Sequence, residues 1–108
     1  MSTRPVYSIN FLSIALTNGN VSYIVPIGFR AIVRAVDLVY DGGPTAANGL
    51  VRISNNNVQL ATIHNVTGQD QFHLMTYQVV NEDEPISCLS SSGNACNFNV
   101  SGYLLSLP

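Results

Sequence analysis

Apolar and polar positions alternate along the chain in short segments that are rich in β-branched and aromatic residues. Spacing typical of an amphipathic helix is hard to find, so this pattern predicts strands throughout. Clusters of Asn, Asp, Gly and Pro separate the segments, and these residues favour positive φ or local side-chain hydrogen bonds. The predicted strands are Val6–Leu16, Asn20–Val25, Phe29–Tyr40, Leu50–Ile53, Val58–Val66, Gln71–Val80, Ile86–Leu89 and Asn97–Leu105. About eight short strands with almost no helix predict one all-β domain over residues 1–108, an antiparallel β-sandwich of jelly-roll kind.

Two local patterns predict how strands are joined. Pro26 lacks an amide proton and Gly28 can adopt positive φ, so the stretch VPIG predicts a turn that ends one strand and starts the next at Phe29. The cluster Thr67–Asp70 predicts a four-residue hairpin loop, with Gly68 at positive φ. Antiparallel pairing across that loop would set His64 opposite His73.

Two of the predicted strands carry apolar residues on both faces. In Phe29–Tyr40 the apolar set changes face near Arg34, which indicates either a β-bulge or burial on both sides. In Gln71–Val80, Phe72 and Leu74 share one face, whereas Met75 and Tyr77 lie on the other. Apolar residues on both faces of a strand favour a second contact surface, and hence an oligomer or a larger assembly.

Composition points the same way. Only 9% of the 108 residues are charged, against roughly 25% in a typical soluble protein. Lysine is absent, the four cations are all arginines, and the net charge is -2. We expect other subunits to cover much of such a surface; a neutral surface of Asn, Ser and Thr is the alternative. The charge is too weak to indicate nucleic acid as a partner.

Neither a membrane span nor an export signal is expected. No apolar run approaches the roughly 18 residues of a transmembrane helix. The first residues, Met-Ser-Thr-Arg-Pro, lack the apolar core of a secretory signal.

Little in the sequence indicates chemistry. Cys88 and Cys96 could form a disulfide across a hairpin, or they could be two buried or half-buried thiols. His64 and His73 could share a metal between subunits, or they could form a stacked or solvent-facing pair. Ser, His and Asp have no spacing that assigns catalytic roles, and no Gly-rich phosphate loop is present. We therefore expect neither an enzyme nor a cofactor.

Three stretches carry a resemblance to a known class of proteins. They are a first strand, then YIVPIGFRAIVR over residues 23–34, and a closing VSGYLL over residues 100–105. With its VPxG turn, apolar strand and terminal SGYxL strand, the chain resembles small β-sandwich virion proteins of tailed bacteriophages. The resemblance implies a minor tail, fibre-associated or head-decoration protein that acts as a homo-oligomer.

Two non-enzymatic functions follow as hypotheses. The first is a structural virion subunit, made in the host cytoplasm, which contacts copies of itself and neighbouring virion proteins. By the resemblance, a trimer is the first expectation. Its predicted contact surface consists of Ile32, Arg34, Met75 and Tyr77, because arginine and aromatic residues suit interfaces better than lysine does. The alternative is a module that binds a glycan or host receptor through loops such as Asp41–Gly49, which Tyr40 borders.

Overall fold

The computed structural model describes residues 6–43, 46–53 and 58–108, and these residues form strands without any helix. No helix long and apolar enough to cross a membrane occurs among them. The strands are β1 (Val6–Ile24), β2 (Phe29–Tyr40), β3 (Ala47–Ile53), β4 (Val58–Val66), β5 (Asp70–Val80) and β6 (Pro85–Ser106). The segment between the predicted strands Leu50–Ile53 and Val58–Val66 lies outside the described residues.

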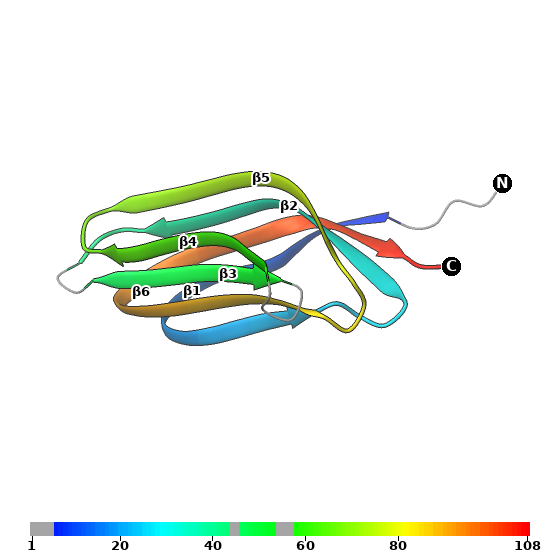
Figure 1. Cartoon of the computed structure of the whole chain (residues 1–108), viewed down its shortest axis with the longest axis horizontal. Helices are drawn as coiled ribbons and strands as arrows, with labels where there is room; N and C mark the ends of the chain where they lie inside the picture. Colours follow the sequence, from blue (N-terminus) through cyan, green and yellow to red (C-terminus); the bar gives the residue numbers. More distant parts are fainter. Residues whose placement is uncertain (1–5, 44–45, 54–57) are drawn as a thin grey trace.

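Two of the six strands, β1 and β6, are long, bent and paired with each other along most of their length (Figure 1). Their antiparallel ladder shifts register between Leu16 and Asn18, where Leu16 pairs with Cys96 and Asn18 pairs with Ser91. The sequence predicted that one strand ends at Leu16 and the next begins at Asn20, and likewise at Leu89 and Asn97. Instead, both strands continue around the bend, and Gly19 adopts a positive φ of 133° there. The eight predicted strands therefore correspond to six, two of which have two arms each.

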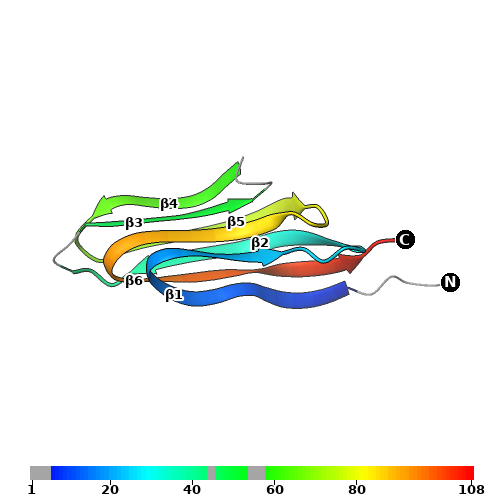
Figure 2. The same ribbon diagram turned by 90° about the horizontal axis from the view of Figure 1, so that it is seen from below.

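The strands form one sheet, which folds over at the bends of β1 and β6 into two facing layers (Figure 2). One layer has the order β4, β3, the Pro85–Ser91 arm of β6 and the Asn18–Ile24 arm of β1. The other has the order β5, β2, the Cys96–Ser106 arm of β6 and the Val6–Leu16 arm of β1. Every ladder in both layers is antiparallel, which confirms the predicted all-β antiparallel fold. The jelly-roll connectivity stays a prediction. The order of the four whole strands and the four arms favours it.

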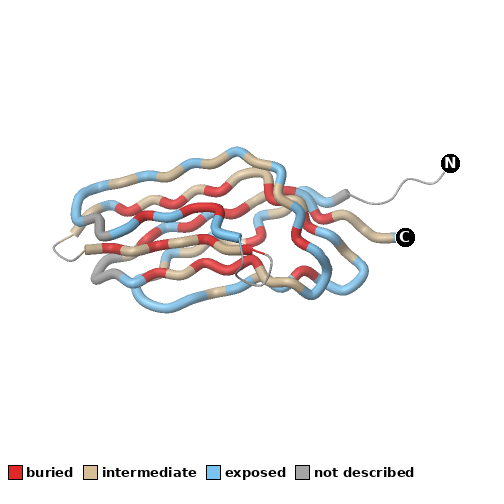
Figure 3. Tube along the Cα trace, in the orientation of Figure 1, coloured by how far each residue is buried: buried red, intermediate tan, exposed pale blue. Residues whose placement is uncertain are grey.

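The core lies between the two layers, and the central strands contribute most of it (Figure 3). Inward-facing side chains alternate with outward-facing ones along β2, β3 and the second arm of β6, as the two-residue period of a strand requires. The largest fully buried side chains on these strands include Tyr40, Leu38, Phe98 and Ile53. Tyr40 therefore belongs to the core and does not border its loop as an exposed aromatic.

The VPIG turn has the predicted conformation. Gly28 has a φ of 92°, and the amide of Phe29 donates to the carbonyl of Pro26 at 3.1 Å, as in a type II turn. A second turn packs against it: the carboxylate of Glu82 accepts a hydrogen bond from the amide of Gly28 at 2.7 Å. The carbonyl of Val25 accepts another from the amide of Asp83 at 2.8 Å. The loop of residues 81–84, between β5 and β6, thus holds the β1–β2 turn.

A β-bulge explains why the apolar positions in the sequence of β2 change face near Arg34. The register of β2 shifts between Val33 and Ala35 against both of its neighbours. The shift places Val33 on the same inward face as Val36, so both are fully buried. Of the two readings of this pattern, the bulge is correct, and most of the apolar residues of β2 belong to one core.

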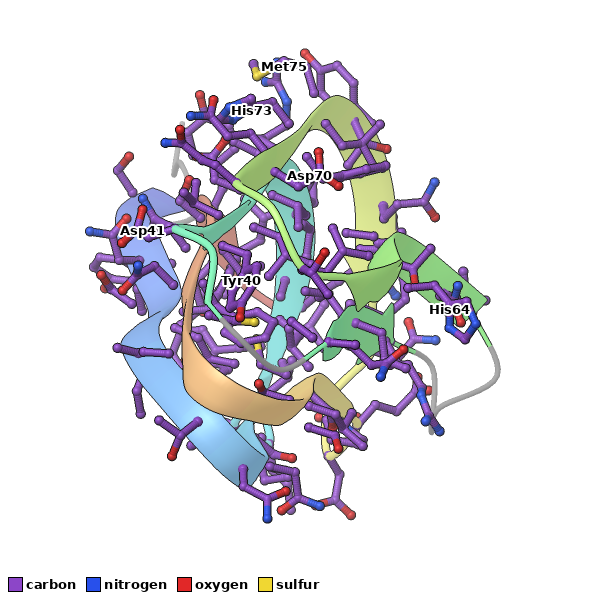
Figure 4. All side chains as sticks on the ribbon, turned by 90° about the vertical axis from the view of Figure 1, so that its left-hand side faces the viewer. Tyr40, Asp41, His64, Asp70, His73 and Met75 are labelled. Carbon is purple, nitrogen blue, oxygen red and sulfur yellow. The ribbon has the colours of Figure 1, made fainter. Side chains whose placement is uncertain are left out.

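The predicted β4–β5 hairpin is wrong. β4 pairs with β3 in one layer and β5 pairs with β2 in the other, so residues 67–69 connect the layers instead of closing a ladder. Gly68 does not adopt positive φ, although the carboxylate of Asp70 accepts a local bond from the amide of Gln71 at 2.9 Å. His64 and His73 consequently lie on different sides of the molecule (Figure 4).

Candidate functional site

The outer face of β5 exposes large apolar side chains. Phe72 and Leu74 point toward the core, so the alternate positions point outward. Met75 is 73% exposed, Tyr77 71% and Val79 49%. β5 is therefore the strand that is apolar on both faces, as its sequence predicted. Figure 4 shows Met75 and His73 projecting away from the core on this side.

Arg34 lies at the β2 bulge, beside these residues. Its guanidinium carbon is 3.7 Å from the ring centroid of Tyr77 and 5.9 Å from that of Tyr103. Its Nε donates a hydrogen bond to the carbonyl of Thr76 at 3.1 Å. A cation over an aromatic ring contributes about 0.5–1 kcal/mol at an exposed site. These contacts hold the guanidinium in a fixed orientation on the surface.

The structure brings all four predicted contact residues together on one outer face. Ile32 pairs with Val79 on β5 and with Tyr103 on β6, which adds two residues to the cluster. We call this surface the aromatic face, and it consists of Ile32, Arg34, Met75, Tyr77, Val79 and Tyr103. Alternation along the strand places Val79 with Met75 and Tyr77. Sequence reasoning missed Tyr103, because nothing local indicates which strand lies next to β2.

A shallow depression of about 360 Å³ adjoins the aromatic face between β1 and β6. Its lining is largely polar and includes Ser8, Asn10 and Ser101 together with Arg34 and Tyr103. Hydroxyl and amide groups around a fixed guanidinium can accept and donate hydrogen bonds at the border of an apolar contact. The arrangement is that of a polar rim beside an apolar patch.

The other end of this outer face is polar. Nδ1 of His73 lies 2.5 Å from a carboxylate oxygen of Asp37, and Nε2 lies 3.1 Å from the side-chain oxygen of Gln71. Both members of the His73–Asp37 pair are substantially exposed to solvent. Within the described ranges, no group of three or more His, Cys, Asp or Glu residues is placed to hold a metal ion. His64 and His73 do not pair with each other, so the arrangement on which a metal shared between subunits was based is wrong.

Cys88 and Cys96 are free, fully buried thiols on the two arms of β6, in different layers. Burial raises the pKa of the Cys88 thiol to about 12, because the interior disfavours the thiolate. The thiolate is the nucleophilic form of cysteine, so this thiol is unsuited to nucleophilic chemistry at neutral pH. In the structure the two cysteines are core residues.

Comparisons of the chain with protein-family models, with curated proteins and with solved structures found no match. Function is therefore inferred from the surface that the structure places at β2, β5 and β6.

Proposed function

We propose that the chain is a non-enzymatic structural protein of a tailed-bacteriophage virion, a self-assembling minor tail or decoration subunit. The observation that carries the proposal is the aromatic face, a cluster of exposed apolar side chains around an oriented arginine. Monomeric proteins rarely expose contiguous apolar patches of large size, and such patches mark interaction sites. Tyrosine, methionine and arginine are the residue types enriched at protein interfaces.

The low charge of the chain supports self-association. Like charges on identical subunits repel when copies meet, and the aromatic face carries a single charged residue, Arg34. Covering apolar surface such as that of Met75 and Tyr77 yields about 25 cal/mol per Å². Closed cyclic symmetry is the usual way in which identical chains bury such a surface, and a trimer remains the first expectation.

The stretches that resemble virion proteins are structural neighbours in this fold. The strand after the VPIG turn and the closing SGYLL strand form the β2–β6 ladder, with Val33 opposite Gly102 and Ile32 opposite Tyr103. These stretches build the sheet that presents the aromatic face. Their association supports a structural role for the motifs.

The alternative, a glycan-binding module, loses its main candidate residue. Sugar sites that use stacking need an exposed aromatic ring, and Tyr40 beside the Asp41–Gly49 loop is fully buried. Residues 44 and 45 of that loop lie outside the described ranges. A glycan array tests the alternative directly: saturable binding of one sugar class by the isolated protein would favour recognition over assembly.

Quantitative mass spectrometry of purified phage particles that encode the chain tests the virion assignment. We expect the chain in the particles at a constant copy number that is a multiple of the subunits in its oligomer. A host protein of similar abundance in the same lysate is the control for carry-over. If the chain is abundant in the lysate but is lost during particle purification to the same extent as this host protein, the assignment is contradicted.

A further inference from the structure

The edge strand β1 is open along its whole length. Within the part of the chain that the structure describes, β1 pairs with β6 alone, in both layers. Figure 2 shows β1 and β4 at opposite sides of the molecule. One side of β1 therefore has a row of backbone N–H and C=O groups without a strand partner, which is a template for another strand.

The usual protections of an edge strand are nearly absent from β1. Its 19 residues include no charged residue and no proline. Natural edge strands are commonly short, or carry lysine, proline or bulges that prevent pairing between molecules. β1 has only one bulge, at Phe11, and this bulge and the bend at Thr17 delimit the regular segment Leu12–Leu16.

The core is also incompletely covered along β1. Leu12, Ile14 and Leu16 pack against the core but are only partly buried, whereas the inward-facing residues of the adjacent β6 arm, such as Phe98 and Val100, are almost fully buried. The difference arises because the adjacent arm has strands on both sides. A strand added beside β1 would cover these three side chains.

We propose that the Leu12–Leu16 segment of β1 pairs antiparallel with the same segment of a second copy, about a two-fold axis at Ile14. The inference rests on the self-association in the proposed function, but it uses a surface distinct from the aromatic face. A two-fold axis places Leu12 opposite Leu16 of the other copy, so that the apolar residues of both edges meet. Outward-facing Ser13 lies opposite Ala15, and neither side chain brings a charge into the contact.

The size of the open edge allows a small contact with a second copy. The two arms of β1 lie at the same edge, since the rings of Phe11 and Tyr23 are 5.2 Å apart across them. Across its long axis the molecule measures about 20 by 18 Å. The five residues Leu12–Leu16 span roughly 17 Å, so their pairing would bury roughly 340 Å² on each copy, which is the size of a weak or transient contact.

Cysteine cross-linking tests the pairing. Only the residue on the two-fold axis lies opposite the same residue of the second copy, with about 5 Å between the two Cα atoms. We expect Ile14→Cys to form a disulfide-linked dimer under mild oxidation, at least tenfold more than Thr62→Cys. Thr62 is the matched control, an exposed residue on the edge strand β4. Equal cross-linking of the two variants would overturn the proposal.

The same experiment in a Met75→Asp/Tyr77→Asp background separates the two contacts. Persistence of the Ile14→Cys dimer there supports pairing through β1 whether or not the aromatic face is a contact. Loss of the cross-link in that background alone would show that β1 does not pair independently and would overturn the proposal as stated. Should Ile14→Cys fail to fold, hydrogen exchange of the wild type replaces it: amides of Leu12–Leu16 should become more protected as protein concentration rises, and no change would contradict pairing.

Discussion

Gly102 allows a close contact between two strand backbones, and the local sequence around it does not indicate this contact. A Cβ atom at this position would clash with the carbonyl oxygen of Ile32 and lie 3.0 Å from the amide nitrogen of Arg34. The β2 bulge brings its backbone this close, so only glycine fits. Sequence reasoning identified Gly28 as a turn residue because Pro26 and Phe29 mark the turn locally. No neighbour of Gly102 in sequence marks a contact with β2.

Replacing Gly102 by alanine should therefore be costly. Because the obstructing atoms are backbone, the strand must move, and we expect Gly102→Ala to lower the free energy of unfolding by roughly 3 kcal/mol or more. Gly68→Ala is the control: a Cβ at Gly68 would meet no atom within 4 Å, and its φ is not positive. It should be neutral or stabilising by about 0.4–1 kcal/mol. Urea unfolding measures both, and equal stability of the two variants would show that Gly102 is not in close contact.

The buried Cys88 thiol predicts a stability loss at alkaline pH. Its pKa is raised from an ordinary value of 9.0 to about 12, so the unfolded chain releases this proton at lower pH than the folded chain. The contribution to stability is full below about pH 9 and falls by about 1.4 kcal/mol per pH unit above it, until the folded thiol ionises.

Between pH 9 and 11 the free energy of unfolding of Cys88→Ala should therefore fall less steeply than that of the wild type. All other side chains are the same in both proteins, so the difference in slope isolates the thiol. Urea unfolding at several pH values gives both slopes, and parallel slopes would contradict a buried, protonated Cys88.

At the scale of elements, the strand positions could be predicted well and their partners could not. The predicted bounds of β2 and β4 agree with the structure, because alternation and flanking turn residues are local signals. The bends in β1 and β6 contain turn-forming residues, but the two strands pair with each other again beyond the bends. A chain reversal and a bend that crosses between layers use the same residue types, so eight segments were expected where six strands occur.

The β4–β5 connection failed for a related reason. The four residues Thr67–Asp70 suit a hairpin loop, but the same length also spans from one layer to the other. Which solution forms depends on the partners of each strand: β3 pairs with β4 and β2 pairs with β5. These partners are set by burial in the whole core, which local turn chemistry does not encode.

The candidate contact surface was predictable in part, because alternation along a strand is a local signal. Alternation along β5 places Met75, Tyr77 and Val79 on one side, and the structure has them there. In β2 the change of face in the apolar pattern comes from the bulge. Most apolar residues of β2 therefore belong to the core and not to a second contact surface. The stacking of Arg34 on Tyr77 depends on the β2–β5 register, which the sequence alone does not specify.

At the scale of the whole molecule, two surfaces remain incompletely covered: the aromatic face and the β1 edge. Both lie on the layer formed by β5, β2 and one arm each of β6 and β1, and both carry few charges. Together with the low overall charge, these features support the proposal that the chain self-associates. The aromatic face is the larger exposure of apolar side chains, so it is the main contact in this account.

Sedimentation equilibrium of the wild type beside Met75→Asp/Tyr77→Asp tests that account most directly. Both positions are exposed on the isolated subunit, so the fold should be retained, and a strand-type circular dichroism spectrum checks this. As a matched control, Thr62→Asp/His64→Asp places the same charges on exposed positions of β4. We predict that the wild type and the control are oligomeric at micromolar concentration, with a mass that is a multiple of 11.6 kDa. The aromatic-face variant should lose at least tenfold in association constant. A wild type that stays monomeric at the high concentrations of a virion would contradict the account.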